Sequence, residues 1–153
     1  MIIADSLTWF DVEGAELDAR TLYDVLALRA AVFVVEQDCP YQDPDGRDLV
    51  EGTRHLVGRV DGEIVAYARI LAPGESHPTP RIGRVIVAPP ARGGQLGRAL
   101  MLRALDVCAE HWPGQAVELG GQAHLTGFYQ SLGFWAVGAP YVEDGIPHQW
   151  MRR

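Results

Sequence analysis

The chain has 153 residues, of which 48% are hydrophobic, and a formal net charge of −7. This length and composition predict one globular domain with an apolar core, spanning residues 1–153. The negative charge argues against a nucleic-acid partner, and no apolar stretch reaches the roughly 20 residues that cross a bilayer. No basic segment leads into an apolar run at the N-terminus, so we expect a cytoplasmic protein that is not bound to a membrane.

The first 40 residues predict a strand followed by a helix. Residues 7–10 are a short strand candidate. Apolar residues at helical spacing then predict a helix from Thr21 to about Gln37, which ends before Pro40. Asp18 or Thr21 is expected to cap its N-terminus.

Residues 39–51 are rich in Asp, Pro and Gly and predict a loop. Three interpretations stay open: a plain turn, an acidic lip beside a substrate amine, and a calcium site. Gly46 comes too early for the spacing of a calcium loop, which disfavours the last. Two cysteines are too few for a disulfide framework or a zinc site, and no metal is expected. Cys108 is expected in the core, whereas Cys39 in the loop is a candidate for exposure.

The rest of the chain predicts a hairpin followed by alternating strands and helices. Asp61-Gly62 joins two strand patterns as a tight hairpin turn does. Strand patterns occupy 55–60, 64–71, 82–88, 115–119, 134–137 and 147–152; helix patterns occupy about 95–111 and 123–132, the second closed by Gly133; and residues 138–145 are expected to be a loop. A strand-helix-strand order requires a parallel pair, so the predicted sheet is mixed.

The segment Arg92-Gly93-Gly94-Gln95-Leu96-Gly97 is the candidate functional site. A glycine turn that opens a helix presents free N–H groups at the positive end of the helix dipole, which suits a phosphate. Arg92 and Arg98 flank it with positive charge. A plain strand-to-helix connection is the alternative. Two phosphate motifs are excluded, because the chain has no lysine for a Gly-Lys-Ser/Thr loop and the segment lacks the dinucleotide glycine pair.

These residues resemble the acetyl-CoA motif of the GNAT superfamily of N-acetyltransferases, which runs Arg/Gln-x-x-Gly-x-Gly/Ala. Arg92 and Gly97 match its ends, and Gln95 stands where the inner glycine is usual. Phe128-Tyr-Gln-Ser-Leu-Gly-Phe134 resembles the segment that closes the family core. Further matches indicate the ElaA-like branch: Arg29-Ala-Ala-Val-Phe-Val-Val-Glu-Gln37 with Cys39-Pro-Tyr41, Gln122-Ala-His124, and Glu143-Asp-Gly-Ile-Pro-His148.

The resemblance implies an α/β fold with a mixed, mostly antiparallel central sheet flanked by helices and a parallel strand pair around the acetyl-CoA site. It implies acetyl transfer from acetyl-CoA to a primary amine, in a small molecule or a protein. The pantetheine arm is then expected beside Val85, Ile86 and Val87. The remaining cofactor-binding residues would be Arg92, Gly93, Gly94, Gln95, Leu96, Gly97 and Arg98. The family chemistry requires no metal, and many relatives form dimers.

By the same resemblance, Tyr129 is the residue expected to protonate the leaving thiolate, with an aromatic core role as the alternative. Glu118 is the first candidate for the general base. Glu36, His55 and His148 are expected to face the acceptor, and with His124 they are alternative bases. Bulk water or a water chain would also serve. A regulatory domain that binds acyl-CoA with little catalysis is the competing function, favoured by Gln95.

Overall fold

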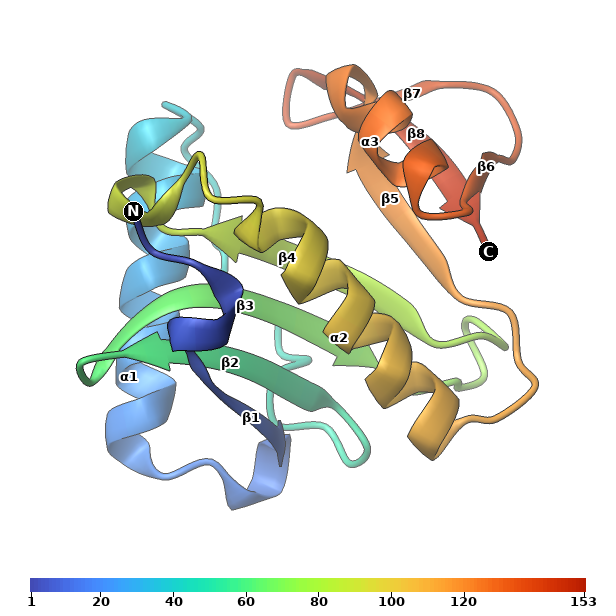
Figure 1. Ribbon diagram of the computed structural model, residues 1–153. Helices are drawn as coiled ribbons and strands as arrows, with labels where there is room; N and C mark the ends of the chain where they lie inside the picture. The colour runs from blue at the N-terminus through green and yellow to red at the C-terminus, as the bar shows by residue number, and fades with distance from the viewer.

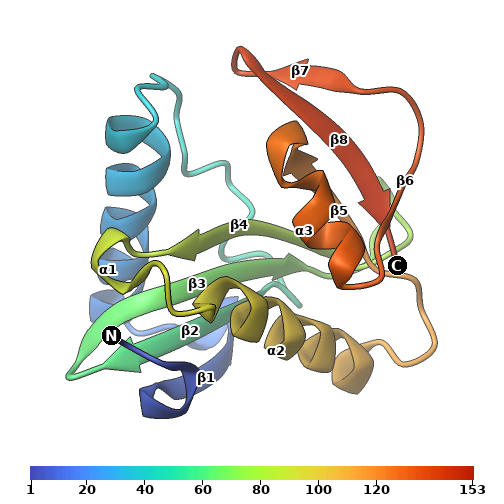
Figure 2. The same ribbon diagram turned by 45° about the horizontal axis from the view of Figure 1, so that its top comes forward.

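The computed structural model describes residues 1–153 as one mixed sheet with three α-helices (Figures 1 and 2). The strands are β1 (Thr8–Glu13), β2 (Arg54–Val60), β3 (Glu63–Leu71), β4 (Arg81–Val87), β5 (Glu118–Gln122), β6 (Trp135–Ala136), β7 (Tyr141–Glu143) and β8 (Ile146–Arg152). The helices are α1 (Ala19–Arg29), α2 (Leu96–His111) and α3 (Thr126–Ser131). The strand order is β1-β2-β3-β4-β5-β8-β6, with β7 paired to β8, and only the β4–β5 pair is parallel. None of the helices is long and apolar enough to cross a membrane.

Local sequence signals account for most of these elements. The Asp18 carboxylate accepts a hydrogen bond of 2.6 Å from the Thr21 amide, so Asp18 is the cap of α1. Asp61 and Gly62 both have positive φ, 50° and 80°, which the predicted hairpin turn between β2 and β3 requires. Gly133 has a φ of 91° just beyond α3, as predicted for the glycine that closes this helix.

The structure differs from the sequence prediction in one helix type, one strand boundary and one added strand. The helix begun by α1 continues to Glu36, but residues 30–36 are π-helical. β5 begins at Glu118 rather than Gln115 and includes Gly120 and Gly121, which weaken a strand signal because glycine has no side chain to pack. The expected loop at 138–145 contains β7, joined to β8 by Asp144 and Gly145 with φ of 51° and 76°. That Asp-Gly pair was a hairpin signal in the sequence.

The helices cover the sheet from both sides and enclose two apolar clusters (Figure 2). Leu96, Leu100, Met101 and Ala104 of α2 are buried in the larger cluster, together with residues of β2, β3 and β4. Arg98 and Arg103, on the opposite arc of the helix, are exposed, as the helical pattern predicts. The smaller cluster lies under α1 and includes Val25. Cys108 is in the larger cluster, as expected.

A bulge in β4 changes which way its side chains face. Ala68 of β3 stands opposite both Arg84 and Val85, and Arg84 has a φ of 51°. Ile82, before the bulge, belongs to the cluster under α2, whereas Ile86, after it, belongs to the cluster under α1. The extra residue therefore turns Val85 and Val87 toward the α2 side of the sheet.

β4 and β5 touch only at their beginnings. Their single register pair is Arg81 with Glu118, after which β5 pairs with β8 instead. Figure 1 shows the two strands diverging toward their carboxyl ends. The second half of β4 consequently has no strand partner on its β5 side, and its backbone groups there are free to pair with something else.

Candidate functional site: a cavity at the start of α2

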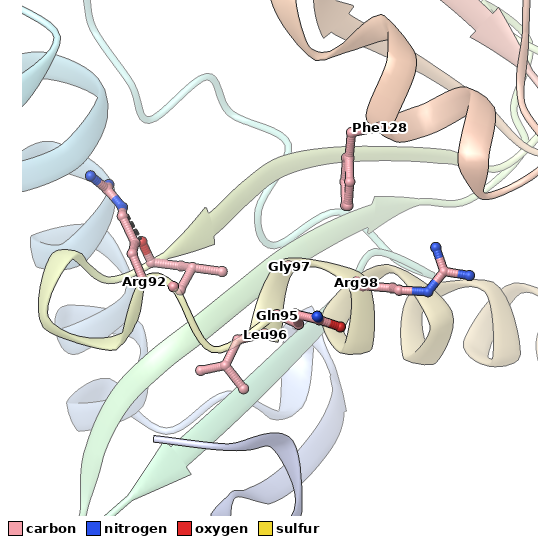
Figure 3. A pocket seen from close by; sticks show the side chains of 8 residues that line it. Arg92, Gln95, Leu96, Gly97, Arg98 and Phe128 are labelled. Carbon is pink, nitrogen blue, oxygen red and sulfur yellow. Dashed lines mark hydrogen bonds between the residues drawn. The ribbon is translucent and has the colours of Figure 1, made fainter. Parts of the chain in front are cut away.

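A cavity of about 340 Å³ lies at the N-terminus of α2, beside the end of β4. Phe128 projects from α3 toward β4 and the start of α2, so three elements meet there (Figure 3). The lining residues are Val87, Arg92, Gly93, Gln95, Leu96, Gly97, Arg98 and Phe128. Seven of these eight are residues that the sequence proposed for cofactor binding, and the fold brings them to one place.

The N-terminus of α2 has no capping side chain. The Ala99 amide donates to the Gln95 carbonyl over 3.3 Å, so the amides of Leu96, Gly97 and Arg98 are the ones left without an intrahelical acceptor. These three N–H groups stand at the positive end of a 16-residue helix. Free N–H groups at a helix start beside a cavity are the arrangement that suits an anion such as a phosphate.

Gln95 takes the conformation for which the family motif usually has a glycine. Its φ of 59° and ψ of 23° lie in the left-handed region, immediately before α2. Its side chain is exposed and makes no hydrogen bond. The departure from the motif therefore leaves a left-handed turn in place. Gly94 adds a close approach, because a Cβ there would collide with the carbonyl oxygen of Ile2.

Arg92 forms hydrogen bonds that hold the turn before α2 in place. Its Nε donates to the Val87 carbonyl over 3.0 Å, the bond drawn in Figure 3, and its Nη atoms donate to both Glu36 oxygens at 2.8 and 3.1 Å. This bidentate pair links the end of the π-helical segment to the turn. Hydrogen bonding by Arg92 lowers the pKa of Glu36, which stays ionised. Arg98 reaches only the Ser131 hydroxyl, at 3.4 Å.

Of the three β4 residues proposed to contact the cofactor, only Val87 lines the cavity. Ile86 is 2% exposed and packs in the cluster under α1, so only its backbone is available. Val85 is half-buried and packs against the larger cluster. All three lie in the part of β4 that has no β5 partner.

Tyr129 lies against β5 with a free hydroxyl. The residue is 6% exposed, and its ring packs edge-on against Phe128 and Phe134. It comes so close to β5 that a Cβ on Gly121 would lie 2.7 Å from Tyr129 Cε2. Burial alone raises the pKa of Tyr129 to about 12, and the hydroxyl makes no hydrogen bond within the protein. The phenol is therefore neutral at physiological pH and free to donate a proton.

Glu118 does not have the environment of a general base. Glu118 is the first residue of β5 and pairs with Arg81 of β4. Arg81 lies six residues before Val87, so Glu118 is roughly 20 Å from the cavity end of β4. The carboxylate accepts hydrogen bonds from Thr79 and from Trp150 Nε1. Burial opposes its ionisation, but these hydrogen bonds outweigh burial and lower the pKa of Glu118. The sequence places a carboxylate on β5, but its hydrogen-bond partners Thr79 and Trp150 are distant in the chain.

The histidines have different surroundings. His55 is 0% exposed: its Nε2 donates to the Asp48 carbonyl over 2.8 Å, and its Nδ1 accepts from the Tyr67 hydroxyl over 2.7 Å. Burial lowers the pKa of His55, so the ring is neutral and cannot meet a substrate. His148 is half-buried on β8 and stacks on Tyr141 at 5.6 Å. His124 is exposed beside β5.

The aspartates of the 39–51 loop form ion pairs with arginines from other elements, which the sequence pattern did not predict. Arg29 of α1 is 0% exposed and donates to Asp43 over 2.7 Å and to Asp48 over 2.5 Å. The full network joins Arg29, Arg69 and Arg84 to Asp43, Asp45 and Asp48. Both the acidic-lip and calcium interpretations are therefore wrong for these carboxylates, because arginine charges already neutralise them.

Cys39 is 9% exposed, so its expected exposure is also wrong. Its Sγ lies 3.7 Å from the Asp144 carbonyl and joins the loop to the β7–β8 hairpin. At the far end of α2, Asp11, Glu110 and His111 bring possible metal ligands within 4.8 Å of one another. Asp11 already pairs with Arg54 at 2.7 Å, and this cluster is about 24 Å, the length of α2, from the cavity.

Comparison with known proteins agrees with this geometry. Residues 29–153 match the family described as "Acetyltransferase (GNAT) domain". Protein ElaA of Escherichia coli (strain K12) is 51% identical over 147 residues, covering 96% of both chains. Its crystal structure superposes with a TM-score of 0.91 over 96% of this chain and 99% of that one.

Two further structures extend the comparison. An acyl-CoA N-acyltransferase from Pseudomonas aeruginosa has a TM-score of 0.94 at 47% identity and covers 97% of this chain and 99% of its own. An aminoglycoside 6'-N-acetyltransferase, crystallised with coenzyme A, shares the fold at 15% identity, with a TM-score of 0.70 over 94% of this chain and 96% of its own. The chain therefore belongs to the GNAT acetyltransferases, within the ElaA-like group.

Proposed function

We propose that this protein transfers an acetyl group from acetyl-CoA to the nitrogen of an amine. The observation that carries the proposal is the uncapped N-terminus of α2, which opens into a cavity beside the unpaired half of β4. An anion site next to unpaired strand backbone suits a ligand with a pyrophosphate at one end and an amide-bearing arm at the other. Coenzyme A has both.

The pyrophosphate would accept hydrogen bonds from the amides of Leu96, Gly97 and Arg98. Arg98 adds a charge that is bound only to a hydroxyl, whereas Arg92 holds the turn through Val87 and Glu36. The pantetheine arm would extend between β4 and β5 and pair with backbone groups near Val85 to Val87. One of those N–H groups would then polarise the thioester carbonyl.

In the reaction, the amine lone pair attacks the thioester carbonyl carbon, a C–N bond forms, and the C–S bond breaks. In this proposal the amine proton passes to water, because no carboxylate or histidine lines the cavity. The departing thiolate receives a proton from Tyr129, which is neutral and has no hydrogen-bond partner within the protein, and the Tyr129 phenolate then regains a proton from water. The products are an N-acetyl amide and CoA with a free thiol.

The binding half of the proposal is tested with acetyl-CoA titrations on Gly97 variants. A Cβ at Gly97 would lie 3.8 Å from Phe128 Cζ and 3.9 Å from Val87 Cγ2, which is ordinary contact. Gly97→Ala should therefore fold and bind within tenfold of wild type. Gly97→Glu places a carboxylate beside the phosphates, where about 4 kcal/mol of repulsion predicts at least a 100-fold loss. Failure of wild type to bind, or equal binding by both variants, would contradict the cofactor site.

The catalytic half is tested by following released CoA with a panel of amines. Tyr129→Phe should lower kcat by roughly 10- to 100-fold while the Kd for acetyl-CoA stays unchanged. Tyr23→Phe is the matched control, because Tyr23 is 72% exposed on α1. Tight acetyl-CoA binding without turnover on any amine would instead support the regulatory, acyl-CoA-binding alternative.

A further inference from the structure

The sheet face opposite α3 has an open region between β4 and β5. Gly120 is exposed although β5 lies between β4 and β8 in the strand order, because β4 has already diverged from it. On β4, a Cβ added at Gly83 would meet no atom within 4 Å. Gly121, the next residue on β5, packs its opposite side against Tyr129. The open region therefore lies on the other side of the sheet from α3.

Arg81 stands at the edge of this region without a polar partner. Its guanidinium carbon lies 4.6 Å from the centre of the Trp150 ring, and its Nε is buried with no hydrogen bond. Every other arginine that is buried or half-buried makes a hydrogen bond or an ion pair. Glu118, its neighbour on β5, is occupied by Thr79 and Trp150. Trp9 Nε1 and Arg69 Nε are also buried without a partner, but Arg69 pairs with Asp45 and Asp48 through its Nη atoms, whereas no nitrogen of Arg81 has a partner in the protein. A ligand would supply one.

A second free donor lies close by. The Tyr141 hydroxyl sits over Gly120, where a Cβ would otherwise be, and has no hydrogen-bond partner within the protein. Trp150 lies against the same glycine, so Tyr141 and the Arg81 side chain that stacks on Trp150 both lie close to Gly120. A guanidinium and a phenol hydroxyl lie near one another there, and neither donates to Glu118, which accepts from Thr79 and Trp150 instead. That donor set matches a carboxylate.

We propose that Arg81 and Tyr141 bind a carboxylate of the acceptor, so that the acceptor is an amine carrying a carboxylate about three peptide residues away. This rests on the proposed function, which places the thioester near Val85. Arg81 is four residues from Val85 along β4, or about 13 Å. The arginine side chain spans part of this distance, so the acceptor's amine at the thioester and its carboxylate at Arg81 are on the order of 10 Å apart. This is the length of an extended tripeptide. The nearby Glu118 carboxylate disfavours a doubly charged phosphate in the same place.

The test compares triglycine with triglycine amide, which differ only in the terminal charge. Binding is measured by titration in the presence of CoA, which needs no turnover, and kcat/KM is measured with acetyl-CoA. Wild type should prefer triglycine at least tenfold. Arg81→Gln should remove that preference, chiefly through KM, and leave acetyl-CoA binding and the weak use of the amide unchanged. Arg103→Gln is the matched control, because Arg103 also stacks on a tryptophan, Trp9 at 4.8 Å, but is exposed on α2.

Tyr141→Phe is the second variant, because it removes one hydroxyl and should fold even if Arg81→Gln does not. It should lower triglycine affinity severalfold and leave the amide unaffected. Equal affinity of wild type for the two peptides, or unchanged triglycine binding in both folded variants, would overturn the carboxylate site and leave the acetyltransferase proposal standing. Failure of wild type to bind acetyl-CoA would overturn the acetyltransferase proposal first, and the acceptor proposal with it.

Discussion

Replacing Gln95 with glycine should stabilise the protein. Gln95 has a φ of 59° and a ψ of 23°, a left-handed conformation that costs a non-glycine residue about 1–2 kcal/mol. Its side chain is exposed and forms no hydrogen bond, so nothing is lost on removal. The greater freedom of glycine in the unfolded chain takes back about 0.5–1 kcal/mol. We therefore expect a net gain of about 0.5–1 kcal/mol in the free energy of unfolding.

Urea denaturation of wild type and Gln95→Gly measures this difference in the free energy of unfolding. In thermal unfolding, Tm should rise by about 2–4 °C for each kcal/mol in a domain of this size. Gln95→Ala is the control, because it also removes the side chain beyond Cβ but keeps the left-handed penalty. It should be no more stable than wild type. If Gln95→Ala were as stabilising as Gln95→Gly, or if Gln95→Gly were destabilising, the strain assigned to this turn would be refuted.

The buried ion network supports two further predictions. Arg29→Met should lower the free energy of unfolding by about 3–5 kcal/mol in urea denaturation, because Asp43 and Asp48 then stay buried with one partner fewer; a loss below 1 kcal/mol would contradict the network's role. Burial disfavours ionisation of Asp45 and Asp48, but arginine hydrogen bonds and charges outweigh it and hold each pKa below its usual range. Their stabilisation is therefore complete above about pH 4, the ordinary aspartate pKa, and is lost as pH falls below it. Chemical denaturation at pH 7, 4 and 3 should show that loss, and Asp48→Asn should reduce its size.

Much of the architecture follows from short stretches of sequence. Asp61-Gly62 fixes a hairpin because both residues accept positive φ, and Gly133 ends a helix for the same reason. The spacing of Leu96, Leu100 and Ala104 sets the buried face of α2. The cavity residues from Arg92 to Arg98 were also foreseeable, because a turn and the helix it opens are neighbours in the chain.

The sequence did not predict the surroundings of residues whose partners are distant in the chain. Glu118 and His55 are ionisable residues on strands, and nothing adjacent in sequence indicates that Trp150 binds the first and Tyr67 the second. The sequence shows that the 39–51 loop is rich in aspartate, but not which cations lie beside it. That the aspartates are neutralised depends on arginines from α1, β3 and β4, 14 to 41 residues away.

The sequence by itself determined most local elements, the family and the turn proposed to bind an anion, since backbone propensity, helical spacing and a contiguous motif are all properties of neighbouring residues. Only the tertiary structure decided which charges are free. The bulge at Arg84 and the divergence of β4 from β5 open the sheet. Most of the arginines form hydrogen bonds or ion pairs with other side chains or carbonyls, whereas Arg81 has no such partner. The physical reason is that hydrogen bonds and ion pairs act over a few ångströms in space, whatever the separation along the chain.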